Sequence, residues 1–315
     1  MKNVLITALG TMNANAIIDA LRAYDSSYHL IGADIYSREC IANSLFVDEF
    51  YQFPRADVET EKYIEYLLDF CKQHTIDVIY CVIDEEVSAI ANRIEEFNAL
   101  GTKVCIPNAE TVNICHNKQK FISWLQTNMP NYCIRTYRTI GDVDQYPVFV
   151  KPNFGRASIG CMKINNKNEL QEVCNTSKNL LIQEYLTGDI VAVDIVSNLK
   201  YNQVGVIQRK ELLRNGNGCG VAVEIIDNKT IDAICREFVQ KMQVNGVINI
   251  EFFVNGEDYK FIEVNPRLAA GTSFSCQAGL NTVINAMQIA QGEPCSLSKI
   301  AVGTHMARRY ETYLI

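Results

Sequence analysis

The segment V-I-N-I-E-F-F-V-N-G-E-D-Y-K-F-I-E-V-N-P-R, residues 247 to 267, constrains the fold more than any other part of the chain. Apolar and polar residues alternate on both sides of an Asn-Gly-Glu-Asp cluster, which is typical of a β-hairpin. The pattern predicts strands at Val247–Val254 and Tyr259–Asn265, joined by a turn over residues 255–258. One glutamate then lies in each strand, Glu251 in the first and Glu263 in the second.

The turn alone leaves two registers of this hairpin open. A two-residue Asn-Gly turn would place Glu251 opposite Lys260 and would mix polar with apolar residues on both faces. A longer turn gathers the apolar residues on one face, and register follows the face that buries them, so we favour it. In that register the expected pairs are Asn255 with Tyr259, Phe252 with Ile262, Ile250 with Val264, Glu251 with Glu263 and Asn249 with Asn265.

The favoured register places two carboxylates directly across the strands, where like charges are destabilising. Two unit charges at about 4 Å repel by about 4 kcal/mol at an effective dielectric of 20. A cation held between Glu251 and Glu263 would remove that repulsion, and Asn265 adds a third oxygen ligand. Oxygen ligands beside nucleotide phosphates suit Mg²⁺, with Mn²⁺ as an alternative ion. A solvated hairpin with both glutamates on its wet face is the competing interpretation.

Size, charge and cysteine content narrow the class of protein. A chain of 315 residues can form two or three domains. Its net charge of −7 argues against sequence-independent nucleic-acid binding. No apolar run approaches the roughly 18 residues of a membrane span, and the first residues lack the pattern of a signal peptide. The 12 cysteines include no C-x-x-C pair and predict reduced thiols in the cytoplasm, while the four histidines lack zinc-ligand spacing.

Residues 1–115 alternate strand and helix patterns, which predicts a doubly wound α/β domain. The expected strands are Val4–Ala8, His29–Ile35, Asp77–Ile83 and Lys103–Ile106, and the expected helices are Asn15–Tyr24, Thr60–Lys72 and Glu85–Phe97. The turn after the first strand carries one glycine, Gly10, in place of G-x-G-x-x-G. We therefore interpret it as a tight turn and expect no NAD site.

Two later segments could hold a nucleotide. Lys151 ends a predicted strand before P-N-F-G-R-A-S-I-G-C, residues 152 to 161, where glycines would let backbone N–H groups approach a phosphate. Q-E-Y-L-T-G-D, residues 183 to 189, reads as a strand that leads into a turn, and its backbone could bind an adenine. Taken alone, the first segment could equally be a surface turn, and the second a plain exit from a strand.

Taken together in this order, these segments resemble the ATP-grasp superfamily, and specifically its carbamoyl-phosphate-synthase-like, single-chain members. The resemblance covers nearly the whole chain. It includes I-D-V-I-Y-C-V-I-D-E-E at residues 76 to 86, Asn117-Lys118, the strand of Lys151 with its glycine turn, the 183–186 segment, and the end of the hairpin. It implies a pre-ATP-grasp α/β domain at 1–115, a small α+β lobe with a phosphate lid at 116–182, and a large lobe with the Mg/ATP site at 183–315.

The resemblance also implies roles for individual residues. Lys118 and Lys151 match the two lysines that contact phosphates, and Arg267 matches the basic residue beside an acyl phosphate. The implied metal ligands are Glu251, Glu263 and Asn265. The implied nucleotide contacts also include the hinge residues Gln183, Glu184, Tyr185 and Leu186 and the lid residues Gly155, Arg156, Ser158 and Gly160. Ile190 stands where an acid often meets the ribose, which leaves the neighbouring Asp189 as the candidate.

The reaction implied is ATP-dependent ligation: a substrate carboxylate becomes an acyl phosphate, and an amine or another nucleophile displaces the phosphate. Lys151 and Arg267 would be the catalytic residues, ATP and Mg²⁺ the cofactors, and a small carboxylate and an amine the substrates. A homodimer is the prior expectation for assembly. The alternatives are a carboxylase or carbamoyl-phosphate-type enzyme, and a regulator that binds nucleotide without turnover. A role for Arg209 or Arg214 in the site is left open, as is a role for 84–86 in binding an amine.

Overall fold

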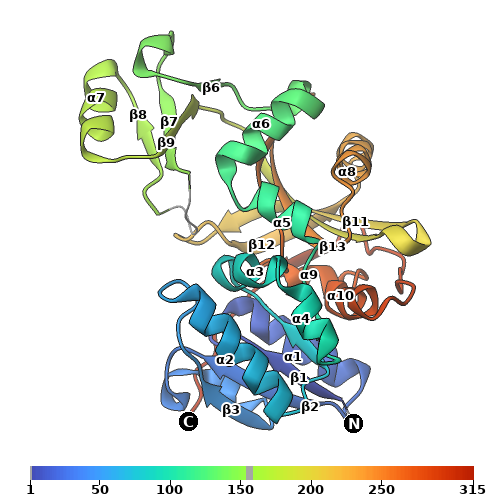
Figure 1. The fold of residues 1–315 in the computed structure, drawn as a ribbon. Coiled ribbons are helices and arrows are strands. Elements are labelled where there is room, and N and C mark those ends of the chain that lie inside the picture. The colour runs from blue at the N-terminus through green and yellow to red at the C-terminus, as the bar shows by residue number, and fades with distance from the viewer. Residues whose placement is uncertain (1, 154–158) are drawn as a thin grey trace.

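The computed structural model describes residues 2–153 and 159–315, and these residues form three sheets, one in each successive part of the chain (Figure 1). The lid residues Gly155, Arg156 and Ser158 lie outside the described residues. Short 3₁₀ turns connect several elements, at Arg38–Cys40, Ala42–Leu45, Pro130–Tyr132, Ile140–Asp142 and Leu199–Tyr201.

The first sheet is parallel, and its strands run in the order β3-β2-β1-β4-β5. These strands are β1 (Asn3–Ile6), β2 (His29–Asp34), β3 (Glu49–Gln52), β4 (Val78–Tyr80) and β5 (Lys103–Val104). One face packs on α1 (Met12–Tyr24), and the other on α2 (Thr60–Gln73), α3 (Asp84–Ala91) and α4 (Ile94–Ala99). The predicted doubly wound α/β layer is confirmed. Its strand order reverses between β1 and β4, which is the crevice where such sheets bind ligands.

Two expectations for this layer were wrong. The single helix predicted over 85–97 is two helices, because Arg93 leaves the helical conformation with φ −118° and ψ 10°. Strand β3 was not predicted. Its four residues show no period-2 apolar pattern, since three are half-buried and one is exposed.

The second sheet is antiparallel and forms a small lobe with strand order β6-β9-β7-β8. Its strands are β6 (Thr136–Tyr137), β7 (Val148–Pro152), β8 (Met162–Ile164) and β9 (Leu180–Glu184), and α7 (Lys167–Thr176) packs on them. The lobe stands away from the rest of the molecule at the upper left of Figure 1. The boundary expected at residue 182 falls inside β9, which pairs with β6 and β7 as far as Glu184.

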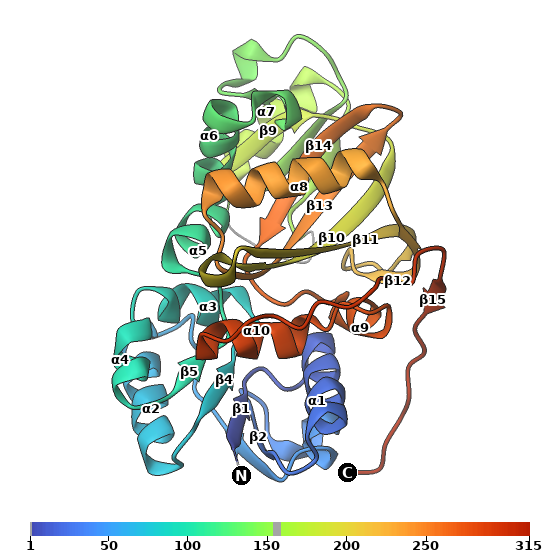
Figure 2. The same ribbon diagram turned by 90° about the vertical axis from the view of Figure 1, so that its right-hand side faces the viewer.

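The third sheet is antiparallel, with strand order β14-β13-β10-β11-β12-β15. Its strands are β10 (Asp189–Asn198), β11 (Gln203–Arg214), β12 (Gly220–Ile226), β13 (Gly246–Asn255), β14 (Asp258–Asn265) and β15 (His305–Ala307). Two helices cover one face, α6 (Lys118–Asn128) and α8 (Lys229–Met242), and α5 (Ala109–Cys115) precedes α6. On the other face lie α9 (Thr272–Gln277) and α10 (Thr282–Gln291), between the sheet and the first layer (Figure 2).

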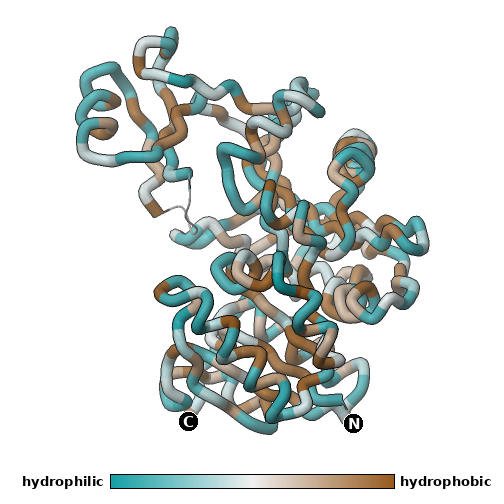
Figure 3. The backbone as a smooth tube through the Cα atoms, in the orientation of Figure 1, coloured by the Kyte–Doolittle hydropathy of each residue, from teal (hydrophilic) through white to brown (hydrophobic). Residues whose placement is uncertain are grey.

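The first layer and the large lobe share one hydrophobic core. Side chains of α1, β1 and β4 pack with α10 and with the inner face of the third sheet. Two long-range hydrogen bonds cross the same junction: Asn13 donates to the Leu268 carbonyl at 2.8 Å, and the Tyr80 hydroxyl donates to the Val283 carbonyl at 2.9 Å. The hydropathy trace shows hydrophobic segments gathered inside these layers and hydrophilic ones at the periphery (Figure 3). Among the described residues no helix combines the length and apolar character needed to cross a bilayer.

Candidate active site

A cleft of about 2020 Å³ lies where the three parts of the chain meet. The predicted site residues that line it are Lys118, Lys151, Gln183, Glu184, Tyr185, Leu186, Glu251, Glu263, Asn265 and Arg267. Gly160 and Asp189 are described but are not among the lining residues. The cleft therefore brings together residues that lie up to 149 positions apart in the chain, from Lys118 to Arg267.

The late hairpin has the predicted register at the end that faces the cleft. Asn249 pairs with Asn265, Ile250 with Val264, and Glu251 with Glu263. The register shifts between Glu251 and Phe252, so that Phe252 lies opposite Phe261 and Asn255 opposite Asp258. The predicted pairs Phe252–Ile262 and Asn255–Tyr259 were therefore wrong. A β-bulge at Ile262 combines a tight turn with the apolar register, which the prediction had treated as exclusive alternatives.

The bulge residue Ile262 also provides a hydrogen-bond acceptor for Lys151. Only 5% of Lys151 is exposed, and its Nζ donates a hydrogen bond to the Ile262 carbonyl at 3.2 Å. Burial lowers the pKa of this ammonium, and the Glu263 carboxylate opposes that shift. Lys151 on β7 of the small lobe thus places a buried ammonium group next to β14, the strand that carries Glu263.

The paired carboxylates lie in a charged setting. Burial, and then the charge of Glu263, raise the pKa of Glu251 to about 7. Arg214 at the end of β11 donates to Glu251 Oε2 at 2.8 Å, which partly balances the charge. Arg214, whose role the sequence left open, thus contacts a candidate metal ligand.

The donor set fits a hard divalent cation. Within the described residues, no three His, Cys, Asp or Glu side chains are grouped so that they could hold a metal. The Asn265 side-chain amide lies beside the carboxylate pair, with its Nδ2 3.4 Å from Glu263 Oε1. Opposed carboxylates supply the negative charge that Mg²⁺ and Mn²⁺ require, and an amide oxygen is an ordinary third ligand. Glu251, Glu263 and Asn265 are therefore the residues that could hold the ion.

Arg267 reaches the first layer. Its Nε and Nη2 donate to the two carboxylate oxygens of Asp84 at 2.8 and 2.9 Å. Burial alone would lower the pKa of Arg267, but Asp84 raises it, so the guanidinium stays charged. Asp84 is the first residue of α3, where a negative charge interacts favourably with the helix dipole. The bidentate pair fixes Arg267 between the two parts of the chain.

Side chains of the hinge segment, residues 183–186, contact neighbouring residues of the small lobe. Gln183 Nε2 donates to the Thr136 hydroxyl at 3.0 Å, and Glu184 Oε1 accepts from the backbone N–H of Arg135 at 3.0 Å. Lys163 lies over the Tyr185 ring, 4.5 Å from its centroid. Residues 184–186 line the cleft beside these contacts.

Other predicted nucleotide residues differ in placement. Asp189 is 57% exposed at its side chain and pairs with Lys210 at 2.5 Å. Ile190, next to it, lines the cleft. Gly160 has a φ of 75°, and a Cβ there would come within 3.0 Å of Pro152. Residues 217–220, between β11 and β12, also line the cleft.

Arg308 lines the cleft but was missed by the sequence analysis. Arg308 follows β15, and its guanidinium contacts Met12 Sδ at 3.1 Å, Ser273 Oγ at 3.1 Å and the Ala270 carbonyl. It also lies 4.6 Å from the centroid of the Phe274 ring. Nothing in the local sequence distinguishes it from the adjacent Arg309. Its place depends on β15, a strand that was not predicted.

Glu86, one of the acids at 84–86 whose role was left open, also lines the cleft and has an unusual environment. It is buried, and its carboxyl accepts from the Thr7 hydroxyl at 2.5 Å and the Tyr63 hydroxyl at 2.9 Å. Burial raises the pKa of Glu86 to about 7, against the effect of both hydroxyls. This residue lies at the carboxyl end of β4, in the crevice of the first sheet.

A pH dependence of stability follows from Glu86. Its folded pKa lies above the ordinary value of 4.5, so folding takes up a proton between about pH 4.5 and 7. The stability it contributes is complete below that window and is lost as pH rises through it. Glu86→Gln cannot titrate, so its melting temperature relative to the wild type should rise from pH 5 to pH 8. Calorimetry at several pH values measures this, and parallel curves would contradict it.

Models of known protein families match most of the chain. An ATP-grasp domain model matches residues 115–271, and a model described as PylC-like, N-terminal domain matches residues 4–105. The first match contains the hinge, both lysines and the hairpin, and the second contains the parallel layer.

Curated relatives are longer proteins. The carbamoyl phosphate synthase large chain of Lachnoclostridium phytofermentans is 26% identical over 240 residues, covering 71% of this chain and 20% of its own. Pyruvate carboxylase of Bacillus subtilis is 22% identical over 273 residues, covering 76% of this chain and 23% of its own. The chain thus spans about a fifth of the length of the curated relatives it matches.

Solved structures share the fold at low identity. The biotin carboxylase domain of Hydrogenobacter thermophilus 2-oxoglutarate carboxylase, crystallised with MgADP, ADP and bicarbonate, superposes with a TM-score of 0.77 at 15% identity, covering 96% of this chain and 73% of that one. N5-carboxyaminoimidazole ribonucleotide synthetase of Thermotoga maritima gives 0.69 at 17%, covering 95% and 78%. L-amino acid ligase of Bacillus licheniformis gives 0.70 at 16%, covering 92% and 74%.

Proposed function

Because this chain belongs to the ATP-grasp family, we propose that it is an ATP-dependent ligase that activates a substrate carboxylate as an acyl phosphate. An amine then attacks the acyl carbon, and the products are an amide, ADP, phosphate and a proton. The observation that carries this proposal is the cross-strand pair Glu251–Glu263, with Asn265 beside it and the buried Lys151 reaching the same strand. Two opposed acids beside a buried lysine suit a magnesium-bound polyphosphate better than any neutral ligand.

Each candidate site residue has a proposed task in this reaction. Lys118 and Lys151 hold phosphate oxygens, and Arg267, kept charged by Asp84, faces the charge that develops on the transferred group. The 183–186 backbone binds the adenine, with Asp189 as a candidate for the ribose, and the lid at 154–160 together with the 217–220 loop excludes water. Magnesium bound by Glu251, Glu263 and Asn265 would neutralise the phosphates when present.

The three parts of the chain divide the work. We assign residues 1–115 to substrate binding at the β1/β4 crevice, 116–182 to covering the phosphates, and 183–315 to the metal and nucleotide. ATP would lie between the two lobes, and the amine would enter from the side of the first layer. The cysteine content agrees with a cytoplasmic protein, and a homodimer is the assembly we assign to it.

Trapping the acyl phosphate tests the proposal without knowledge of the amine. The protein is incubated with Mg-ATP, pools of small carboxylates and hydroxylamine, which converts an acyl phosphate to a stable hydroxamate. We expect hydroxamate and ADP in a one-to-one ratio for one pool. A protein that binds Mg-ATP but forms neither product with any pool would support a regulator without turnover.

A carboxylation reaction is the second candidate, because several similar proteins are carboxylases. Here bicarbonate would attack ATP to give carboxyphosphate. ADP release that requires bicarbonate and no other carboxylate would favour this reaction over ligation.

Arg308 is the residue we assign to a carboxylate group of the substrate. Among the described residues it contacts only neutral groups, and its Nε is buried without a hydrogen-bond partner. Burial lowers the pKa of this guanidinium, and the nearby Arg209 adds to that effect. A half-buried cation in a cleft, whose hydrogen-bond partners are all neutral, is a favourable site for an anion.

Replacing Arg308 should weaken substrate binding selectively. Loss of a hydrogen bond to a charged group is worth about 1.5–3 kcal/mol, so Arg308→Met should raise the KM for the carboxylate by roughly 10- to 100-fold. The KM for ATP should stay the same. Arg309→Met is the matched control, because its side chain is 86% exposed and pairs with Glu311. Equal kinetics for the two variants would refute the assignment.

A further inference from the structure

An irregular stretch of β11 brings an acid and a base together at the cleft wall. Side chains three positions apart on a regular strand point to opposite faces, as Glu211 and Arg214 would. The pairing of β11 with β12 shifts register between these two residues, and both line the cleft. Irregularities of this kind re-aim single side chains. The strand therefore presents Glu211 and Arg214 on the same side, beside the hairpin glutamates.

The carboxylate of Glu211 lies close to the backbone of the next strand. Only 7% of its side chain is exposed. A Cβ at position 220 would come within 2.7 Å of Glu211 Oε1 and 2.8 Å of Oε2. Glycine at position 220, the first residue of β12, therefore leaves the room that this buried acid occupies.

Glu211 and Arg214 attract each other without forming a hydrogen bond. Arg214 Nε is 3.2 Å from Glu211 Oε2, yet both atoms are buried without a hydrogen-bond partner among the described residues. Arg214 donates from Nη2 to Glu251 Oε2 at 2.8 Å instead. The guanidinium thus lies between two acids and forms a hydrogen bond with only one of them. A buried donor and a buried acceptor that stay unpaired are unfavourable, so the contact with Glu211 is poised to form.

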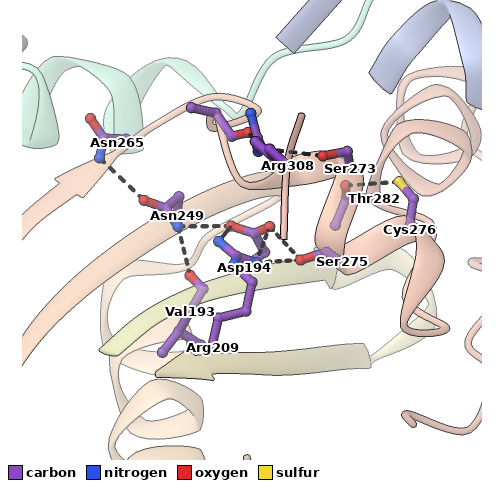
Figure 4. A network of polar contacts seen from close by, with 11 residues as sticks. Val193, Asp194, Arg209, Asn249, Asn265, Ser273, Ser275, Cys276, Thr282 and Arg308 are labelled. Carbon is purple, nitrogen blue, oxygen red and sulfur yellow. Dashed lines mark hydrogen bonds and ion pairs between the residues drawn. The ribbon is translucent and has the colours of Figure 1, made fainter. Parts of the chain in front are cut away.

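A second arginine near Glu211 is already engaged elsewhere. Burial raises the pKa of Glu211, and Arg214 and then Arg209 oppose that shift. Arg209, however, donates from Nη1 and Nη2 to the two carboxylate oxygens of Asp194 at 2.6 and 3.1 Å, and also contacts Ser275 (Figure 4). Arg214 is therefore the guanidinium that can change its partner on this wall.

We propose that Arg214 is the resident counter-ion of the hairpin carboxylates and passes from Glu251 to Glu211 when a divalent cation binds, so that Glu211 sets the affinity of the site for that cation. The inference rests on the proposed function for the presence of the cation, and on these contacts for the exchange. When Arg214 leaves, Glu251 Oε2 is released for the cation, and Arg214 Nε completes its hydrogen bond with Glu211. Glu211 is a positioning residue, because it acts through Arg214 and touches no reacting atom.

Manganese binding measures the exchange without turnover. Mn²⁺ is titrated into the protein, with ADP and without it, and free Mn²⁺ is followed by electron paramagnetic resonance. Arg214→Met removes the competing cation, so Mn²⁺ should bind about 10- to 100-fold more tightly, the factor that one hydrogen bond to a charged group is worth. Glu211→Gln removes the charge that draws Arg214 away from Glu251, so Mn²⁺ should bind about 10-fold more weakly. Arg214→Gln carries the same expectation as Arg214→Met should the methionine variant fail to fold.

Two matched controls lie outside the cleft lining. Glu224→Gln removes an acid of β12, in the same sheet as Glu211, and Arg236→Met removes an arginine of α8 that pairs with Asp232. Both variants should bind Mn²⁺ as the wild type does. A purely structural effect of the main variants would lower Mn²⁺ affinity and would not raise it, as Arg214→Met is expected to do.

The double variant separates exchange from simple charge. In an Arg214→Met background Glu211 has nothing to act through, so Glu211→Gln should leave Mn²⁺ affinity unchanged. Equal weakening in both backgrounds would show that Glu211 acts by its own charge and would overturn the inference, as would unchanged or weaker Mn²⁺ binding by Arg214→Met. Absence of Mn²⁺ binding by the wild type and by Arg214→Met, with or without ADP, would overturn the proposed metal site itself, and this inference with it.

Discussion

Glu263→Ala should abolish ATP turnover while the protein stays folded. The variant removes one of two opposed carboxylates from the proposed metal site, and we expect ADP release to fall at least ~10²- to 10³-fold, as when one charge-stabilising group is lost. The melting temperature of the nucleotide-free protein should be unchanged or higher, because Glu263 faces Glu251 across the strands and its removal relieves repulsion. Coupled ADP assays and thermal unfolding measure both effects.

The matched control is Glu257→Ala in the exposed turn of the same hairpin. It removes an acid of the same charge without touching the cleft, so its turnover should equal that of the wild type. Wild-type ADP release from a folded Glu263→Ala protein would refute the metal assignment.

Arg209→Met should produce the largest loss of stability. Arg209 is only 1% exposed and makes a bidentate ion pair with Asp194. Removing one partner leaves a buried charge uncompensated, which costs about 3–5 kcal/mol. Urea unfolding should therefore show a lower midpoint at an unchanged slope.

Two further variants distinguish a buried charge from a generally sensitive strand. Replacing both partners, in Arg209→Met with Asp194→Leu, should recover most of the stability, because apolar replacement of a buried pair is often neutral. Lys210→Met removes the neighbouring cation, whose pair with Asp189 is exposed, and should cost less than about 1 kcal/mol. An Arg209→Met protein as stable as Lys210→Met would contradict the argument.

The register of the β13–β14 hairpin was predictable from the local sequence pattern only in part. Pairing of Glu251 with Glu263 was predictable because the alternate register would have mixed polar and apolar residues on both faces of the hairpin. The bulge at Ile262 was not, because one extra residue changes neither the composition nor the apolar alternation on either side of it. The lysine that uses the bulge carbonyl comes from another lobe, 111 residues away.

Long-range partners explain the rest of what the sequence could not predict. The acids at 84–86 were open between a helix start and a binding role. Asp84 does begin a helix, but its pairing with Arg267 spans 183 residues. Arg308 lies in the cleft only because β15 adds to the edge of β12. A three-residue strand at an edge leaves almost no periodic signal.

The shared core between the parallel layer and the large lobe limits how the enzyme can open. Apolar side chains of α1, β1 and β4 pack against those of α10 in one core. We therefore expect the parallel layer and the large lobe to move together as one rigid body. Entry and exit of ligands then fall to the small lobe, whose own core is separate. In the proposed function, the cleft wall that contains Asp84, Glu86 and Arg308 would stay in place during each cycle and would select the substrate by fixed shape and charge.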